Sequence, residues 1–185
     1  MNGSQKIIAL FVTSFVTSCV SLKTPNRTDH TQLTAPMALG KYPVKVDETV
    51  PWKNKTDTVI TRTVWHHFEN PNNSYNDQLD QATHIELQLV DNHHLEATLF
   101  NRNNALRNVI LTGKLKNGYF RFKHDFSMIG VPPFYWRTSS TKKQIGIGKK
   151  GQLFIDRADE TNGGLLIVTA GTPGFTRSLT VNPYK

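Results

Sequence analysis

The sequence predicts an all-β domain, and two observations carry that prediction. From about Thr56 onward, no stretch keeps the 3.6-residue apolar period of an amphipathic helix. Apolar and polar residues instead alternate with period two, and turn residues recur about every ten positions. The length of 185 residues allows about one domain, and the single cysteine excludes an intrachain disulfide framework and a thiolate zinc site.

The first expected strands lie in the middle of the chain. One strand is predicted over residues 58–68, where apolar and polar residues begin to alternate. Residues 85–89 and 95–99 repeat this alternation on either side of the turn residues Asp91 and Asn92. They predict a hairpin with one buried face.

The dipeptide Asn117-Gly118 gives the clearest turn signal. Both residues accept the positive φ values of a type I′ turn, whose twist matches the flanking strands. A two-residue loop there pairs Lys116 with Tyr119 and Leu115 with Phe120, and it continues to pair Lys114 with Arg121, Gly113 with Phe122 and Thr112 with Lys123. One face of this hairpin is then apolar and the other basic. The like charges of Lys114 and Arg121 face each other, which is mildly destabilising unless a carboxylate, solvent or an anionic partner compensates.

Four further strands are expected at residues 134–138, 144–148, 152–156 and 164–170, joined by a turn at 149–151 and an acidic loop at 156–163. The total is about eight or nine strands in sequential order. Short connections favour antiparallel neighbours, and a long sheet usually closes or folds over to remove its edges. We therefore expect a lipocalin-like barrel or half-barrel, with a two-sheet sandwich as the alternative.

The N-terminal segment has a different character. Lys6 precedes an apolar run of roughly ten residues, which is too short to cross a bilayer and is typical of a secretory signal peptide. The run ends in Val16-Thr17-Ser18-Cys19, with an aliphatic residue three positions before the cysteine and a small one directly before it. This segment, over the first 19 residues only, resembles the signal peptide of bacterial lipoproteins.

That resemblance implies cleavage after residue 18 and attachment of a diacylglycerol, with further acylation (palmitate in the typical case), to Cys19. Two or more acyl chains make a stable membrane anchor. Val20 stands where some bacteria place an inner-membrane retention Asp, so the resemblance favours the outer membrane of the cell envelope. Residues 19–45, rich in Thr, Pro and Asn, are expected to form a flexible tether, and residues 46–185 the all-β domain. The alternative is an ordinary signal peptide with a chance cysteine, which would release a soluble protein.

Twenty-two Lys and Arg residues against 14 Asp and Glu give a net charge of +8. Basic and aromatic residues gather in two stretches, and a generally basic, solvated surface is the alternative explanation. Because an exported protein rarely meets nucleic acid, we expect anionic lipids or acidic glycans as ligands. The candidate ligand residues are Lys114, Lys116, Tyr119, Arg121, Lys123, Tyr135, Trp136 and Arg137.

Other motifs favour a non-catalytic protein. Residues 146–151 match the dinucleotide fingerprint in letters, but the following residues predict a strand instead of the required helix. Adjacent residues of a strand point to opposite faces, so only one histidine of each doublet, at 66–67 and 93–94, could serve a common metal site. Two strands could bring one of them near His84, but no pattern fixes such proximity, and no metal site is expected. With no catalytic motif and no expected cofactor, two hypotheses remain. One is a lipid-anchored binding module for an apolar or anionic envelope ligand, and the other is a structural adaptor that docks on an envelope protein.

Overall fold

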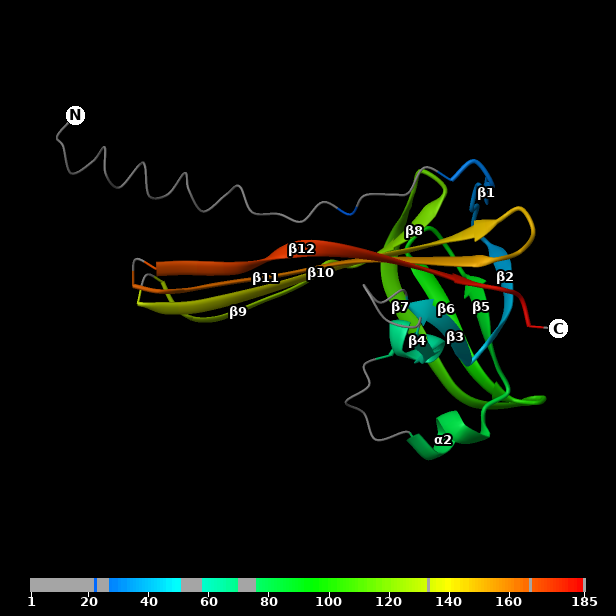
Figure 1. Cartoon of the computed structure of the whole chain (residues 1–185). Helices are drawn as coiled ribbons and strands as arrows, with labels where there is room; N and C mark the ends of the chain where they lie inside the picture. Colours follow the sequence, from blue (N-terminus) through cyan, green and yellow to red (C-terminus); the bar gives the residue numbers. More distant parts are fainter. Residues whose placement is uncertain are drawn as a thin grey trace. The chain divides into compact units, whose positions relative to one another are not determined.

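The computed structural model describes residues 22, 27–50, 58–69, 76–132, 134–166 and 168–184 (Figure 1). Nearly all of this part of the chain is antiparallel β-structure, which confirms the predicted fold class. The helical segments described are a short 3-10 helix, η1 (Val64–His67), and α2 (Asn76–Gln81). The alternation with period two was thus a sound guide to the fold.

Ten strands of the described chain form one sheet, and β3 (Lys45–Val50) and β4 (Thr58–Thr63) form a separate pair. The order is β12-β11-β10-β8-β7-β6-β5-β2, and β1 and β9 each pair with β10. The ten strands are β1 (His30–Thr31), β2 (Met37–Pro43), β5 (His84–Leu89), β6 (His94–Asn101), β7 (Asn104–Lys116), β8 (Tyr119–Phe122), β9 (Asp125–Val131), β10 (Tyr135–Gly148), β11 (Leu153–Leu165) and β12 (Val168–Val181).

The sheet is not closed into a barrel. Its pairing path ends at β2 and β12, as in a half-barrel or a sandwich. Beyond the end of β12, the Tyr184 backbone N–H donates to the Lys41 carbonyl of β2 at 2.8 Å. One backbone hydrogen bond therefore links the two ends of the path without a strand ladder between them.

The described chain divides into two compact units rather than the single domain expected for residues 46–185. Unit 1 takes in His124–Lys142 and Arg157–Arg177, and unit 2 takes in Pro25–Lys123, Lys143–Asp156 and Ser178–Lys185. The boundary falls within β10, β11 and β12, each of which gives one segment to each unit. The sequence predicts two strands at residues 134–138 and 144–148, but the structure has one continuous strand, β10. Polar residues 139–143 join the two predicted strands without a turn.

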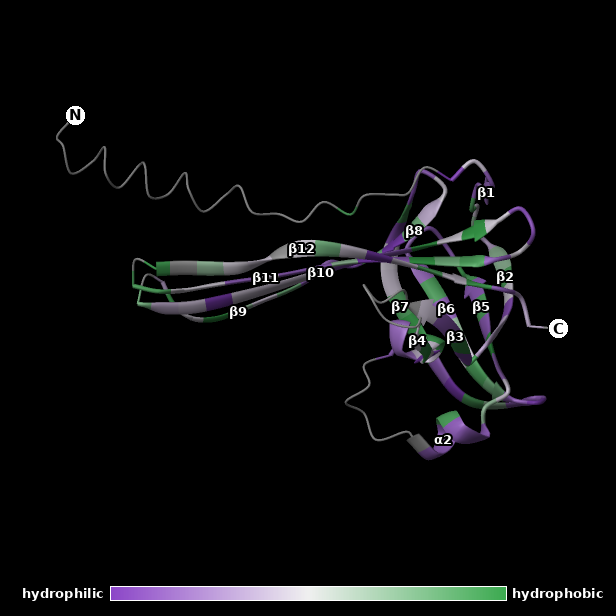
Figure 2. Ribbon diagram, in the orientation of Figure 1, coloured by the Kyte–Doolittle hydropathy of each residue, from purple (hydrophilic) through white to green (hydrophobic). Residues whose placement is uncertain are grey.

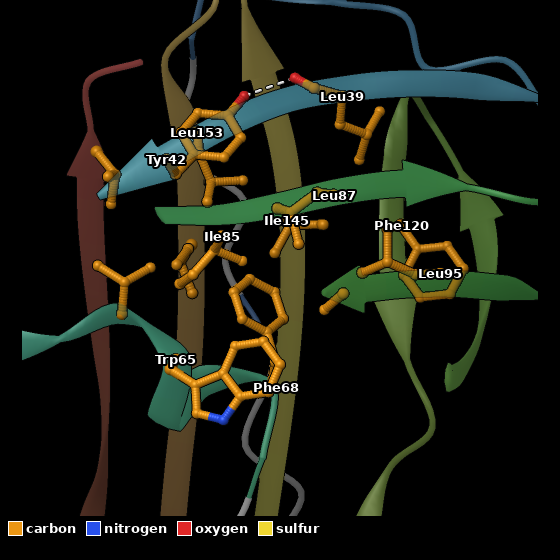
Figure 3. Packing of buried hydrophobic residues seen from close by; sticks show 14 of the residues in the cluster. Leu39, Tyr42, Trp65, Phe68, Ile85, Leu87, Leu95, Phe120, Ile145 and Leu153 are labelled. Carbon is orange, nitrogen blue, oxygen red and sulfur yellow. Dashed lines mark hydrogen bonds between the residues drawn. The ribbon is translucent and has the colours of Figure 1, made fainter. Parts of the chain in front are cut away.

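The hydrophobic core lies in unit 2 (Figure 3). Leu39 and Tyr42 of β2, Trp65 of η1, Ile145 of β10 and Leu153 of β11 come together there from distant parts of the sequence. The Tyr42 hydroxyl donates to the Leu39 carbonyl at 2.7 Å, which satisfies the polar atom inside the core. Burial raises the pKa of Tyr42 to about 12, so this donor keeps its proton at neutral pH.

The hairpin at Asn117-Gly118 has the predicted register. Lys116 pairs with Tyr119, Leu115 with Phe120, and Lys114 with Arg121. Asn117 has φ 53° and Gly118 has φ 77°, as the turn type requires. The predicted apolar face packs on the core through these side chains: Leu111, Leu115, Phe120 and Phe122.

The predicted tether is wrong in its second half. Strands β1 and β2 fall inside residues 19–45, and Leu33, Leu39 and Tyr42 are buried in the core. The folded unit therefore begins near Arg27. The proline and threonine content of this segment predicts a linker. Composition does not detect the strands, because their apolar residues, at positions 33, 37, 39, 42 and 44, are few and widely spaced.

Two local predictions also need correction. The stretch 156–163, expected as an acidic loop, is part of β11, and the Asp156 side chain is fully buried. The pair His66-His67 lies in η1 and not in a strand. Local composition favours a loop at residues 156–163 and a strand at residues 66–67. Packing against neighbouring elements produces a strand in the first place and a 3-10 helix in the second.

Candidate functional site

The structure divides the predicted ligand residues between the two units. Lys114, Lys116, Tyr119, Arg121 and Lys123 lie on or next to β7 and β8 in unit 2. The other predicted residues, Tyr135, Trp136 and Arg137, lie on β10 in unit 1.

In the unit 2 set, the lysines and the tyrosine differ in access to solvent. Lys114 and Lys116 are exposed, and Lys114 faces Arg121 across the strand pair as predicted. Tyr119 is only 3% exposed, and its ring stacks on His30 of β1 with centroids 5.2 Å apart. The tyrosine is thus a packing residue, while the lysines remain accessible to an anion.

A buried ion pair stands beside this hairpin within unit 2. Arg27 donates to both carboxylate oxygens of Asp156, at 2.8 and 2.9 Å. Ser178 and Gln144 donate to the same carboxylate at 2.6 and 3.0 Å, and the Arg27 guanidinium lies 4.2 Å from the Phe154 ring centre. Burial lowers the pKa of Arg27, but the hydrogen bonds and charge of Asp156 outweigh it, so the pKa is raised.

This arrangement is structural in character. Asp156 has no exposed surface, and its carboxylate accepts four hydrogen bonds from protein donors, so it is closed to a substrate. Arg27 ties the start of the folded chain to β11 and β12, and its partner Asp156 also accepts from Gln144 of β10. Sequence reasoning missed this pair because 129 residues separate its members.

An open depression of about 340 Å³ lies on strands β2, β5 and β6 of unit 2. Lys41, Glu86 and Glu96 are among its lining residues, and the Lys41 Nζ lies 2.6 Å from a Glu86 carboxylate oxygen. The hydrogen bond from Lys41 lowers the pKa of Glu86. Because charged side chains of both signs stand among the described residues of its lining, and Lys41 already pairs with Glu86, this depression offers no free cation to a ligand.

Unit 1 is built differently. Strands β9, β10, β11 and β12 lie side by side in it (Figure 1), and every residue of β9 is exposed. The two connections, between β9 and β10 and between β11 and β12, lie next to each other because the Leu166 N–H donates to the Phe134 carbonyl at 2.9 Å. Both residues sit in turns, and both are strongly exposed, Phe134 at 65% and Leu166 at 59%.

Apolar side chains from all four strands share one face at these turns. Val131 pairs with Tyr135, so the two project to the same side. Tyr135 and Thr141 lie an even number of positions apart on β10, so their side chains share a face. The Thr141 hydroxyl donates to the Asp159 carboxylate, and odd-numbered residues of β11 therefore lie on this face too. A Cβ added to Gly171 of β12 would meet the Asn162 side chain of β11, so even-numbered residues of β12 share a face with odd-numbered residues of β11. The face therefore carries Val131, Tyr135, Leu165 and Val168, all exposed.

The same part of unit 1 is free of charge. Although 19% of the chain is charged, residues 126–136 and 161–176 contain no Asp, Glu, Lys, Arg or His. We call the described residues 129–132, 134–136, 163–166 and 168–170 the uncharged tip. Figure 2 shows its hydrophobic colouring at the turn end of β11 and β12. The sequence carried this signal as two long uncharged runs, but period-two analysis does not search for them.

Leu166 adds a second unusual feature to the tip. Its φ is 53°, in the left-handed region where Asn, Asp and Gly are preferred. Asn117 occupies the same φ in the other hairpin and fits the preference. An apolar residue at such a position costs about 1 kcal/mol of backbone strain. Strain of this kind is a reason to look for a function of the side chain.

The remaining predicted features do not add a site. Within the described residues, no group of three or more His, Cys, Asp or Glu side chains is placed to hold a metal ion. His84 is buried and stacks between Phe100 and Tyr184, with ring centres 5.3 and 5.2 Å away. In the described part of the chain, no helix combines the length and apolar character needed to cross a membrane. Cys19 lies outside the described residues.

Comparison of the whole chain with protein-family models, with curated proteins and with solved structures finds no match. The uncharged tip of unit 1 is therefore the candidate functional site on the evidence of the chain's own residues.

Proposed function

We propose that this protein is a lipid-anchored, non-catalytic component of a bacterial cell envelope, and that it binds an apolar envelope component through the uncharged tip of unit 1. The single observation that supports the binding surface is the exposure of Phe134 and Leu166 in two adjoining turns. Turns of soluble proteins usually carry polar residues. An exposed apolar cluster of this kind marks an interaction site.

The energetics favour a partner for this surface. Moving a Leu, Val or Phe side chain from water to an apolar environment gains about 1.5–3 kcal/mol. The tip presents several such side chains on one face and in both turns. Most of that gain is unrealised while the tip faces water, so a modest apolar contact would already bind.

The proposed anchor supports this function by proximity. A diacylglyceryl group on Cys19 would hold the chain at a membrane surface. Eight residue steps separate Cys19 from Arg27, where unit 2 is already folded, and a fully extended chain of that length reaches at most about 29 Å. The proposed tether would thus be short, and it would keep the folded chain close to the anchor.

A second candidate function is binding of an anionic lipid or glycan at Lys114 and Arg121. The observation that favours it is the like-charge pair that these residues form across β7 and β8. An anion would relieve their repulsion. Replacing Lys114→Gln should then weaken the binding of anionic ligands and raise stability in their absence, and an unchanged affinity would exclude this role.

Site-specific photo-crosslinking in cells tests the main proposal. A photoreactive phenylalanine analogue at position 134 should form adducts with an envelope component, and the same analogue at Ile110 should not. Ile110 of β7 is a matched control, because it is 64% exposed but lies beside Glu96 in unit 2. Equal or absent adducts at the two positions would contradict the proposal. The anchor is tested by mass: Cys19→Ser should abolish acylation and release the protein from membranes.

A further inference from the structure

The order of side chains along the unit 1 strands identifies the apolar component. Phe134 and Leu166 lie outermost, in the turns, and Tyr135 follows directly. Trp136 comes next on β10, on the opposite face of the sheet, and Arg137 is the first charged residue beyond it. Membrane proteins show the same order from the hydrocarbon of a bilayer outward to its headgroups. Aliphatic residues and Phe come first, Tyr and Trp follow, and cations come last.

Charge distribution agrees with that order. A charge placed in the hydrocarbon of a bilayer is costly, and the tip has none on either face. The first charges of both hairpins, Asp125, Arg137, Glu160 and Arg177, lie outside the uncharged runs. A binding pocket for one small lipid would need a concave lining, whereas these side chains project from turns at the end of a sheet.

The backbone limits how deep such a tip can go. The Leu166 N–H is satisfied by Phe134, and the four strands bond to one another, but β9 and β12 keep unpaired outer edges in the described structure of unit 1. Open sheet edges do not occur in the hydrocarbon core. Arg137 lies three residue steps from Phe134, or about 10 Å along a strand. This matches the shallow depth of interfacial segments, about 5–10 Å.

We propose that the uncharged tip inserts into the interfacial region of one leaflet of a phospholipid bilayer, with Phe134 and Leu166 deepest and Arg137 at the headgroups. The inference rests on the proposed function, since it names the component that the tip binds. The strained position of Leu166 supports it, because a side chain kept there at a cost to the backbone is one that the tip uses.

The test places a fluorescent probe at the tip. Cys19 is the only cysteine of the chain, so the full chain carrying Cys19→Ser accepts a single label at Phe134→Cys. The probe is the environment-sensitive fluorophore NBD, and the membranes are vesicles of phosphatidylethanolamine and phosphatidylglycerol at a molar ratio of about 3:1. Insertion predicts a blue shift, a rise in emission of about twofold or more, and quenching by lipids with a spin label near the headgroup end of the acyl chain.

Matched variants make the result specific to the tip. A label at Ser127→Cys, on the exposed β9 and four residues further from the turn than Val131, should not respond. Adding Leu166→Asp to the chain labelled at position 134 should abolish the response, and adding Ile110→Asp should leave it unchanged. Asp tolerates the left-handed φ of residue 166, so folding should be kept, as circular dichroism would verify.

The insertion would be overturned if the label at position 134 showed no blue shift and no rise in emission although the chain sediments with the vesicles. We call such a label silent. The outcomes also separate the two proposals. If the label is silent but cellular crosslinking at position 134 yields a protein adduct, the proposed function stands and the bilayer insertion falls. If the label is silent and crosslinking yields nothing, both fall.

Discussion

Units 1 and 2 use the same three strands in opposite ways. In unit 2, β10 and β11 contribute buried residues such as Ile145 and Leu153 to a core closed over by β2 and η1. In unit 1, the other segments of the same strands expose Tyr135 and Leu165. Since strand formation is common to both, the comparison shows that pairing alone does not decide whether a strand's apolar residues are buried. Apolar residues of a strand are buried only where another element covers the face of the sheet from which they project.

The largest expected contrast is between two phenylalanines. Phe120 is fully buried in unit 2, and Phe120→Ala should lower the free energy of unfolding by about 3–5 kcal/mol through lost burial and a residual cavity. Phe134 is exposed in unit 1, and Phe134→Ala should change that free energy by no more than about 0.5 kcal/mol. Urea-induced unfolding measures both. A large loss for Phe134→Ala would mean that the tip is covered and would remove the basis for its role.

A second contrast compares two aspartates of β11. Asp156→Ala leaves the Arg27 guanidinium, 12% exposed in its side chain, without its carboxylate and should cost about 3 kcal/mol. Asp159 pairs with the more exposed Arg157 in unit 1, so Asp159→Ala should cost less than about 1 kcal/mol. Thermal unfolding of the two variants under the same conditions gives the comparison. Equal losses would show that unit 1 relies on its ion pairs as much as unit 2 does.

The smallest contrast concerns two turn residues with the same φ of 53°. Asn117→Leu in unit 2 should destabilise the protein by about 1 kcal/mol, because a branched apolar residue is strained there. Leu166→Asn in unit 1 should stabilise it by a similar amount and, by removing the outermost apolar side chain, weaken membrane binding. Chemical unfolding and the vesicle assay measure the two effects. A loss of stability in Leu166→Asn would show that Leu166 is a packing residue.

The sequence was most informative where structure is local. Period-two alternation and the Asn117-Gly118 turn led to the fold class and to the register of one hairpin, because both depend on neighbouring residues. The pairing of β1 with β10 and the contact of Arg27 with Asp156 could not be foreseen, since they join residues more than one hundred positions apart. The candidate site was predicted in part: the basic and aromatic character of residues 134–137 points to this stretch, whereas nothing in that pattern points to Leu166.

The contact of Arg27 with Asp156 and Ser178 also bears on when the protein can fold. The first described strand, β1, pairs with residues near Gly148, and Arg27 needs partners at positions 156 and 178. A ribosome must therefore finish most of the chain before its beginning finds a place, and such non-local contacts slow folding to milliseconds or longer. Arg27 and β1 therefore stay without their partners until late in synthesis, and a protein carrying the proposed signal peptide has to leave the cytoplasm before it is fully folded.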